Sequence, residues 1–128
     1  MQTYLAKAQS KSGTWAMFIG RWQPWHDGHR WLIDQALNEG KKVLLCVRDV
    51  PVSEKNPWPA QEILVNLNNE LRDLVEEGRL IVQIIPDIES VNIGRGIGYD
   101  VIEHVPPTEI EQISATKIRE QMKAEGKL

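Results

Sequence analysis

The chain has 128 residues, of which 41% are hydrophobic and 26% are charged, and its formal net charge is −3. These proportions predict one soluble globular domain, and the negative charge excludes a general attraction to nucleic acid or to anionic membranes. Because Cys46 is the single cysteine, an intramolecular disulfide is excluded. Its place in an apolar run indicates core packing in a reducing compartment. No apolar run reaches the roughly 20 residues of a membrane span. We therefore expect a cytoplasmic protein with a flexible arm (1–13) and one domain (14–128).

Strands and helices alternate in the first part of the chain. Residues 14–19 form a short apolar run that ends at a glycine, which is typical of a buried strand. Residues 28–39 have an apolar face and precede Gly40, which predicts a helix and its end. Residues 42–48 and 80–85 are further apolar runs, typical of buried parallel strands. Because short joints favour right-handed parallel crossovers, the predicted fold is a Rossmann-like, open, doubly wound α/β sheet.

A loop and a long helix are predicted between the second and third strands. Residues 49–58 contain two prolines and are interpreted as a loop. Pro59 suits the first turn of a helix. Apolar residues then recur at three- and four-residue steps, which predicts one continuous helix as far as Gly78.

The remaining stretch is less regular. The sequence between the third strand and position 113 is compatible with strands at 91–93 and 99–105, and it shows no full helix. Ser114 is a good N-cap, and the last predicted helix runs from there to about Gly126.

Two histidines lie where the first strand is followed by the first helix, in the segment GRWQPWHDGH (20–29). Ligands of open α/β sheets bind at the carboxyl ends of strands, where a helix N-terminus favours phosphate. His26 and His29 can donate hydrogen bonds to phosphoryl oxygens, and Gly28 allows a close backbone approach. The alternatives are a metal held by the pair, without a further ligand cluster beside it, and histidines of no functional consequence. His104, alone in a predicted strand, is interpreted as structural.

A second polar segment, ISATKIR (113–119), opens the last predicted helix. The hydroxyls of Ser114 and Thr116 and the first-turn N–H groups point in one direction there, and Lys117 and Arg119 add positive charge. This combination predicts a binding site for a triphosphate. The alternative is simple helix capping with solvated charges on the following turn.

Both segments resemble the signatures of a known superfamily. GRWQPWHDGH resembles the H-x-G-H signature of the nucleotidyltransferase superfamily, and ISATKIR resembles its I-S-x-T-x-x-R signature, in the same order. Asn56-Pro57-Trp58 resembles the N-P-aromatic loop of some of its adenylyltransferases. The resemblance covers residues 15 to about 122. It implies an enzyme that transfers a nucleoside monophosphate from a nucleoside triphosphate to a phosphate-bearing small molecule and releases pyrophosphate.

The resemblance also implies roles for individual residues. His26 and His29 would contact the nucleotide phosphates, with His29 stabilising the transition state at the α-phosphorus, and Arg119 would hold the β- and γ-phosphates. Magnesium would enter with the triphosphate, so no protein-held metal is expected. Beside these three catalytic residues, the implied nucleotide-binding residues are Gly20, Arg21, Trp22, Gln23, Pro24, Gly28, Ser114, Thr116 and Lys117.

The segment before the histidines bears on the choice of nucleotide. RWQP (21–24) resembles the R-F-Q-P lead-in of archaeal-type nicotinamide mononucleotide adenylyltransferases, whereas cytidylyltransferases usually carry a G-T-F-D-type lead-in. We therefore expect ATP as the donor, with CTP as the alternative. Residues 87–113 are fewer than in the nicotinamide mononucleotide enzymes and lack their pattern, so that acceptor specificity is not transferred.

Five further residues are candidates for binding the acceptor or its phosphate: Arg48, Lys55, Asn56, Trp58 and Arg95. The alternative for the two cations at 48 and 55 is a solvated surface charge, and for Arg95 it is a glycine-rich surface turn. Trp25 or Trp58 either stacks on a base or fills space near the cleft.

Two other classes of protein are alternatives. A non-catalytic nucleotide-binding module of the same fold has no need of both imidazoles, and a fragment of a class I aminoacyl-tRNA synthetase would carry a lysine-rich loop that this chain lacks. The expected partners are a nucleoside triphosphate and a small phosphorylated acceptor, with neither nucleic acid nor membrane. Homo-oligomerisation is expected only by analogy with the superfamily.

Overall fold

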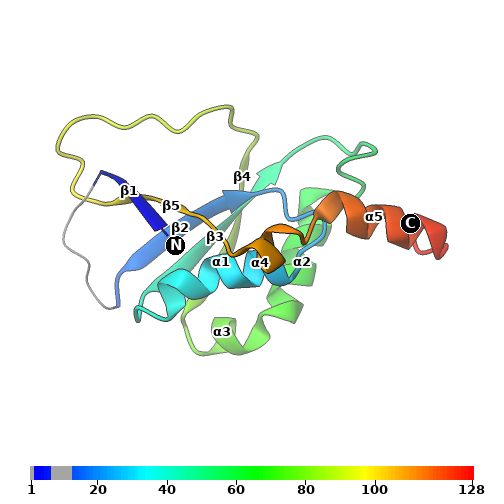
Figure 1. Ribbon diagram of the computed structural model, residues 1–128, viewed down its shortest axis with the longest axis horizontal. Helices are drawn as coiled ribbons and strands as arrows, with labels where there is room; N and C mark the ends of the chain where they lie inside the picture. The colour runs from blue at the N-terminus through cyan, green and yellow to red at the C-terminus, as the bar shows by residue number, and fades with distance from the viewer. Residues whose placement is uncertain (1, 7–12) are drawn as a thin grey trace.

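The computed structural model describes residues 2–6 and 13–128. At its centre is a three-stranded parallel sheet with the order β2-β3-β4 (Figure 1). Its strands are β2 (Trp15–Gly20), β3 (Lys42–Asp49) and β4 (Leu80–Pro86). The connecting helices are α1 (Asp27–Leu37), α2 (Ala60–Glu70) and α3 (Arg72–Glu76). The predicted Rossmann-like α/β fold is confirmed in its parallel sheet and flanking helices.

The helices α1, α2 and α3 all lie on one side of this sheet (Figure 1). The chain crosses the sheet in one direction, from β2 to β3 to β4, so two right-handed crossovers place their helices on the same face. A doubly wound sheet requires this direction to reverse. In the described residues it does not reverse, because the next strand, β5 (Val101–His104), pairs antiparallel with β1 (Gln2–Ala6) in a separate sheet. In the described residues, helices therefore cover one face of the sheet.

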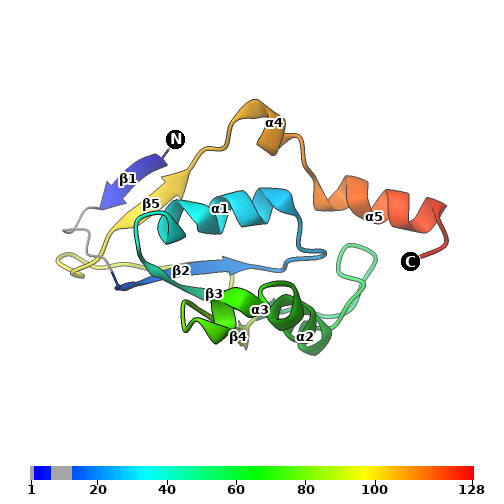
Figure 2. The same cartoon turned by 90° about the horizontal axis from the view of Figure 1, so that it is seen from below.

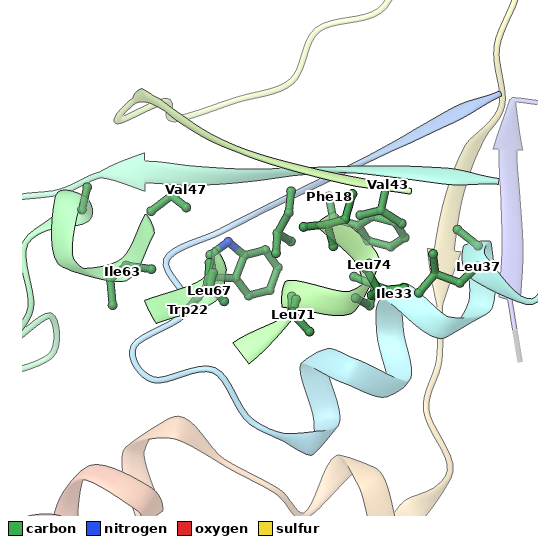
Figure 3. Close-up of a cluster of buried hydrophobic side chains, with 14 residues drawn as sticks. Phe18, Trp22, Ile33, Leu37, Val43, Val47, Ile63, Leu67, Leu71 and Leu74 are labelled. Carbon is green, nitrogen blue, oxygen red and sulfur yellow. The ribbon is translucent and has the colours of Figure 1, made fainter. Parts of the chain in front are cut away.

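The hydrophobic core fills the space between the sheet and its helices (Figure 3). Successive side chains of a strand point to opposite faces, so every second residue of each strand faces the helices. The core residues include Phe18, Ile33, Leu37, Val43, Leu45, Val47, Ile63, Leu67, Leu74 and Leu80. On the opposite face Trp15, Met17 and Ile81 are 48%, 61% and 48% exposed. One apolar layer therefore stabilises the sheet in this chain.

The single helix predicted from Pro59 to Gly78 is in fact two. Pro59 is the N-cap of α2, and Leu71, with φ −108° and ψ 27°, separates α2 from α3. Leu71 and Leu74 are 3% and 8% exposed, so the change of direction keeps the apolar side chains of both segments in the core. Periodicity detects such a stripe but not a bend within it. Gly78 ends α3 with a φ of 72°, as its position predicts.

The two terminal parts of the chain differ from their predictions. Residues 91–93 form no strand, and residues 99–105 contain only the short β5. The short helix α4 (Thr108–Glu111) was not predicted. Within the expected arm, residues 2–6 form β1, which pairs antiparallel with β5, while residue 1 and residues 7–12 lie outside the described chain.

The last helix, α5 (Ala115–Ala124), begins at the predicted N-cap Ser114 and projects beyond the end of the sheet (Figure 2). None of its residues is buried. Among the helices of the described chain, none combines the length and the hydropathy that crossing a bilayer requires.

Candidate functional site

Three segments meet at the carboxyl end of the parallel sheet (Figure 2). They are the loop after β2, the loop after β3 and the start of α5. Parallel strands end at the same edge, so the first two loops are neighbours because of the strand order. The start of α5 is brought there by tertiary contacts, which places the two signature segments side by side.

Trp22 determines the turn that leaves β2. Its φ of 54° lies in the left-handed region, which costs a non-glycine residue about 1–2 kcal/mol. Its indole Nε1 donates to the Cys46 carbonyl oxygen at 2.9 Å, and its ring lies edge-on to Trp25 and His29, with centroids 5.5 and 4.8 Å away. A Cβ on Gly20 would lie 2.8 Å from this indole. The structure thus places Trp22 in the core and gives Gly20 the task of leaving room for it.

The histidine pair caps the first helix. His26 is the N-cap of α1, and its Nδ1 accepts a hydrogen bond from the Gly28 N–H at 3.0 Å. His29 Nδ1 accepts from the His26 N–H at 3.2 Å, so the two side chains form a reciprocal capping box. Their rings are stacked, with centroids 3.6 Å apart and planes 17° apart. Because each Nδ1 accepts, the proton of each neutral ring is on Nε2, which makes Nε2 a hydrogen-bond donor.

Burial keeps both imidazoles neutral near neutral pH. Burial and, to a lesser degree, the neighbouring His26 together lower the pKa of His29 to about 3. Burial also lowers the pKa of His26, against the raising effect of the Asp27 carboxylate. The site therefore presents two neutral N–H donors at a helix N-terminus, an arrangement suited to phosphoryl oxygens.

Arg119 joins α5 to the loop after β2. Its Nη1 donates a short hydrogen bond to the Gln23 carbonyl oxygen, and its Nη2 lies 3.4 Å from Thr116 Oγ1. Ser114 caps α5 by accepting from the Lys117 N–H at 3.3 Å. The first turn of α5 and the start of α1 therefore face the same loop, as a shared phosphate site requires.

Gln23, one of the predicted nucleotide-binding residues, makes hydrogen bonds within the protein through its side chain. The side chain is buried, its Nε2 donates to the Trp58 carbonyl oxygen at 2.8 Å, and its Oε1 accepts from the Trp58 N–H at 3.1 Å. Asn56, in the same loop, is also buried, and its backbone N–H and its Nδ2 both donate to Ser53 Oγ. Gln23 and Asn56 thus shape the loop between β3 and α2.

The other predicted acceptor residues are distributed differently. Arg48 donates through Nε and Nη2 to Asp87 Oδ1, at 3.1 and 2.7 Å, at the edge of a cavity of about 260 Å³ that Ile19 and Ser90 also line. Lys55 is exposed in the loop after β3. Arg95 is exposed in the segment that leads from β4 back to β5 (Figure 1).

The remaining predicted nucleotide-binding residues lie in the loop after β2 and at the starts of α1 and α5. Arg21, Thr116 and Lys117 are exposed, as a ligand-binding surface requires. A Cβ on Gly28 would lie 2.8 Å from His26 Cε1, so this glycine makes room for the capping imidazole.

An apolar cleft lies beside the histidines. Its volume is about 340 Å³, and it is lined by Trp22, Pro24, Trp25, Trp58, Ile63, Asn66, Leu67, Glu70 and Met122. Trp25 also lies 5.3 Å from His29 between ring centroids. The two tryptophans predicted either to stack on a base or to fill space therefore both line this cleft.

Several residues of this region were not predicted. Asp87 could have been found, because it directly follows β4 at the edge where Arg48 ends β3. Met122 had no sequence signal as a cleft residue, since its place depends on how α5 packs. No group of three or more histidine, cysteine or carboxylate side chains that could hold a metal occurs among the described residues.

Comparison with known proteins gives two relatives. A nicotinamide-nucleotide adenylyltransferase of Methanospirillum hungatei JF-1 is 31% identical over 79 residues, which are 60% of this chain and 42% of that protein. A nicotinamide-nucleotide adenylyltransferase of Caldivirga maquilingensis is 35% identical over 77 residues, 58% of this chain and 43% of that protein. The match thus spans less than half the length of these curated relatives. No protein-family model matches the chain. The chain is related in sequence to adenylyltransferases over somewhat more than half its length.

Proposed function

We propose that this protein is a nucleotidyltransferase that transfers a nucleoside monophosphate, AMP in the first instance, from a nucleoside triphosphate to a phosphate-bearing small molecule. The observation that carries the proposal is the pair of neutral imidazoles at the start of α1. Backbone N–H groups occupy both Nδ1 atoms, so both Nε2–H groups remain as donors. Arg119 reaches the same loop from the second signature segment.

The reaction needs charge stabilisation more than proton transfer. A phosphate oxygen of the acceptor forms a bond to the α-phosphorus, and the bond from that phosphorus to the bridging oxygen of the β-phosphate breaks. The leaving group is pyrophosphate. Because the acceptor phosphate is already an anion near neutral pH, no general base is required. The Nε2–H groups of His26 and His29 stabilise the charge that grows on the α-phosphate oxygens.

Arg119 and the first turn of α5 suit the β- and γ-phosphates. A guanidinium has five N–H donors, and two of its nitrogens already contact Gln23 and Thr116, which fixes its orientation. The remaining N–H groups, the exposed Lys117 and the helix N-terminus provide positive potential for the leaving pyrophosphate. Magnesium enters as part of the substrate, bound to the triphosphate.

Two observations favour ATP over CTP. The RWQP lead-in resembles that of adenylyltransferases, and both matched relatives are named as adenylyltransferases. The names of those relatives make nicotinamide mononucleotide the first acceptor to test. The different sequence over 87–113 is the reason to test other phosphorylated acceptors beside it.

The cavity beside Arg48 is our candidate acceptor site. It lies at the carboxyl ends of β2 and β3, the edge at which open α/β sheets bind their ligands. The Asp87 carboxylate holds the guanidinium of Arg48 at the rim of this cavity. An acceptor phosphate can bind to the donors of Arg48 that Asp87 leaves open.

The test is pyrophosphate release by purified protein supplied with magnesium and each of ATP, CTP, GTP and UTP. The acceptors are nicotinamide mononucleotide, glycerol 3-phosphate, phosphoethanolamine and phosphopantetheine. We expect release that requires both ATP and one acceptor. Tight triphosphate binding without release for any pair would instead support a non-catalytic binding module.

Replacement of one histidine tests the proposed chemistry. We expect His29→Ala to lower kcat by about 10²–10³-fold with the fold retained, the usual effect of losing one transition-state donor. His104→Ala is the matched control, since His104 lies in β5 and packs on Phe18 away from the helix N-terminus. Equal turnover of wild type and His29→Ala would contradict the assignment.

A further inference from the structure

Gln23 is the residue through which the three segments of the site are connected. Its side-chain amide makes two hydrogen bonds to the backbone of Trp58, 35 positions along the chain. Its main-chain carbonyl accepts from Arg119, 96 positions along the chain. The side chain is only 4% exposed, so water does not replace these bonds readily.

The position of α5 depends strongly on this contact. None of the residues of α5 is buried, and the helix projects beyond the sheet (Figure 2). A second polar contact, from Lys123 to Glu54 at 3.4 Å, joins two exposed side chains and contributes little. Met122 of α5 lines the cleft that Trp58 also lines. Arg119 therefore joins α5 to Gln23 itself, and Met122 shares the cleft with Trp58, whose backbone Gln23 binds.

We propose that Gln23 is a positioning residue, which aligns the phosphate-binding start of α5 and the loop after β3 with the histidines of α1. This inference rests on the proposed transfer reaction. Triphosphate transfer needs the histidines and Arg119 in one fixed geometry, and an error of about 1 Å can cost about a hundredfold in rate. Gln23 acts through Trp58 and Arg119 rather than by contact with the substrate.

The glutamine amide is suited to this position because it carries a donor and an acceptor side by side. A carboxylate of the same shape keeps the acceptor for the Trp58 N–H but has no donor for the Trp58 carbonyl. It also brings a negative charge against that carbonyl in a buried place. Gln23→Glu therefore removes one of the two bonds with almost no change in volume.

The first experiment compares variants in the pyrophosphate assay. We expect Gln23→Ala and Gln23→Glu to lower kcat/KM for the triphosphate by about tenfold to a hundredfold at about pH 8. The control is Gln35→Ala, because Gln35 Nε2 makes the same kind of bond, to the Trp31 carbonyl at 2.9 Å, within α1 alone. Activities of both Gln23 variants equal to that of Gln35→Ala would overturn the proposal.

A pH series separates positioning from general loss of structure. Burial raises the pKa of a carboxyl, and a protonated carboxyl regains a donor for the Trp58 carbonyl. The activity of Gln23→Glu relative to wild type should therefore rise as the pH falls from about 8 to about 6, while that of Gln23→Ala stays low. A constant ratio for Gln23→Glu would contradict the predicted bond.

Hydrogen exchange tests the connection without any activity. In Gln23→Ala, the amides of residues 54–56, 58 and 60 and those of residues 115–120 should exchange at least severalfold faster than in wild type, and those of α1 should not. Unchanged exchange in both segments would overturn the proposal. If wild-type protein releases no pyrophosphate with any pair, the proposed function fails, and the exchange result alone decides whether Gln23 holds the two segments.

Discussion

The two imidazoles at the start of α1 serve structure and proposed chemistry with different atoms. Their Nδ1 atoms cap the helix, and their Nε2 atoms remain for a ligand. The cap determines which nitrogen carries the proton, so the hydrogen bonds that cap the start of the helix also leave the Nε2–H groups as donors. Residues that combine both roles are sensitive to small changes beside them.

At Gly28, the addition of a single methyl group is enough to disturb the capping imidazole of His26. In Gly28→Ala the added Cβ meets His26 Cε1 at 2.8 Å and Nδ1 at 3.0 Å, so the capping imidazole must move. We expect kcat/KM to fall by about tenfold to a hundredfold, with about 1 kcal/mol of cap stabilisation lost. Gly94→Ala is the control, since a Cβ there meets no heavy atom within 4 Å. Steady-state kinetics and urea unfolding of both variants measure the difference.

Acid should destabilise the protein through His29. Its pKa is lowered from 6.5 to about 3, so between these two pH values the unfolded chain binds a proton at His29 and the folded chain does not. The stabilising contribution is complete above 6.5 and is lost as the pH falls from there towards about 3. Wild type should therefore lose more unfolding free energy than His29→Gln between about pH 7 and about pH 5. Urea unfolding at both pH values checks this, and equal losses would contradict it.

At the scale of elements, α5 combines an exposed helix with a functional first turn. Helices without a buried face depend on their caps and on a few anchoring contacts. The N-cap Ser114 and the anchor Arg119 both lie in the segment proposed to bind phosphate. Stability of this helix and affinity for a triphosphate can therefore be separated by the choice of cap.

Two replacements of Ser114 make that separation. Ser114→Ala removes the acceptor for the Lys117 N–H and should destabilise α5 by about 1 kcal/mol, seen as faster amide exchange in that helix. Ser114→Asp keeps a good cap but adds a negative charge where phosphate is proposed to bind. We expect Ser114→Asp to keep normal exchange and to raise KM for the triphosphate severalfold. Normal KM in Ser114→Asp would place the triphosphate elsewhere.

At the scale of the whole molecule, the sheet has a helix-covered face and an open one. This arrangement follows from the strand order β2-β3-β4, in which the described part of the chain keeps one direction across the sheet. Neighbouring residues of one strand consequently differ sharply in burial. Leu80 is 2% exposed, whereas Ile81, the next residue of β4, is 48% exposed.

These two residues test the one-sided core. Leu80→Ala should lower the free energy of unfolding by about 2–5 kcal/mol, because it leaves a cavity among packed side chains. Ile81→Ala should cost about 1 kcal/mol or less, since half of that side chain is already in water. Chemical denaturation of both variants gives the comparison. A large loss for Ile81→Ala would show that the second face is covered in solution.

The local features of this chain could be predicted from its sequence. The apolar runs of the three parallel strands, the helix after the first strand, its glycine stop and the cap at Ser114 all depend on neighbouring residues. The two signature segments were likewise recognisable from residue type and spacing. Such features are visible in sequence because hydrogen bonding and periodicity act over a few positions.

Contacts between distant segments were decided by the tertiary structure alone. The bend at Leu71 and the pairing of β1 with β5 depend on packing partners far along the chain. The same is true of the internal use of Gln23, whose partners are Trp58 and Arg119. The sequence places Gln23 beside a predicted phosphate-binding segment, which indicates a ligand-binding role. Only the fold shows a distant backbone that satisfies both the donor and the acceptor of its amide. Sequence thus predicted which residues form the proposed site, and tertiary packing determined that Gln23 bonds to Trp58 and Arg119.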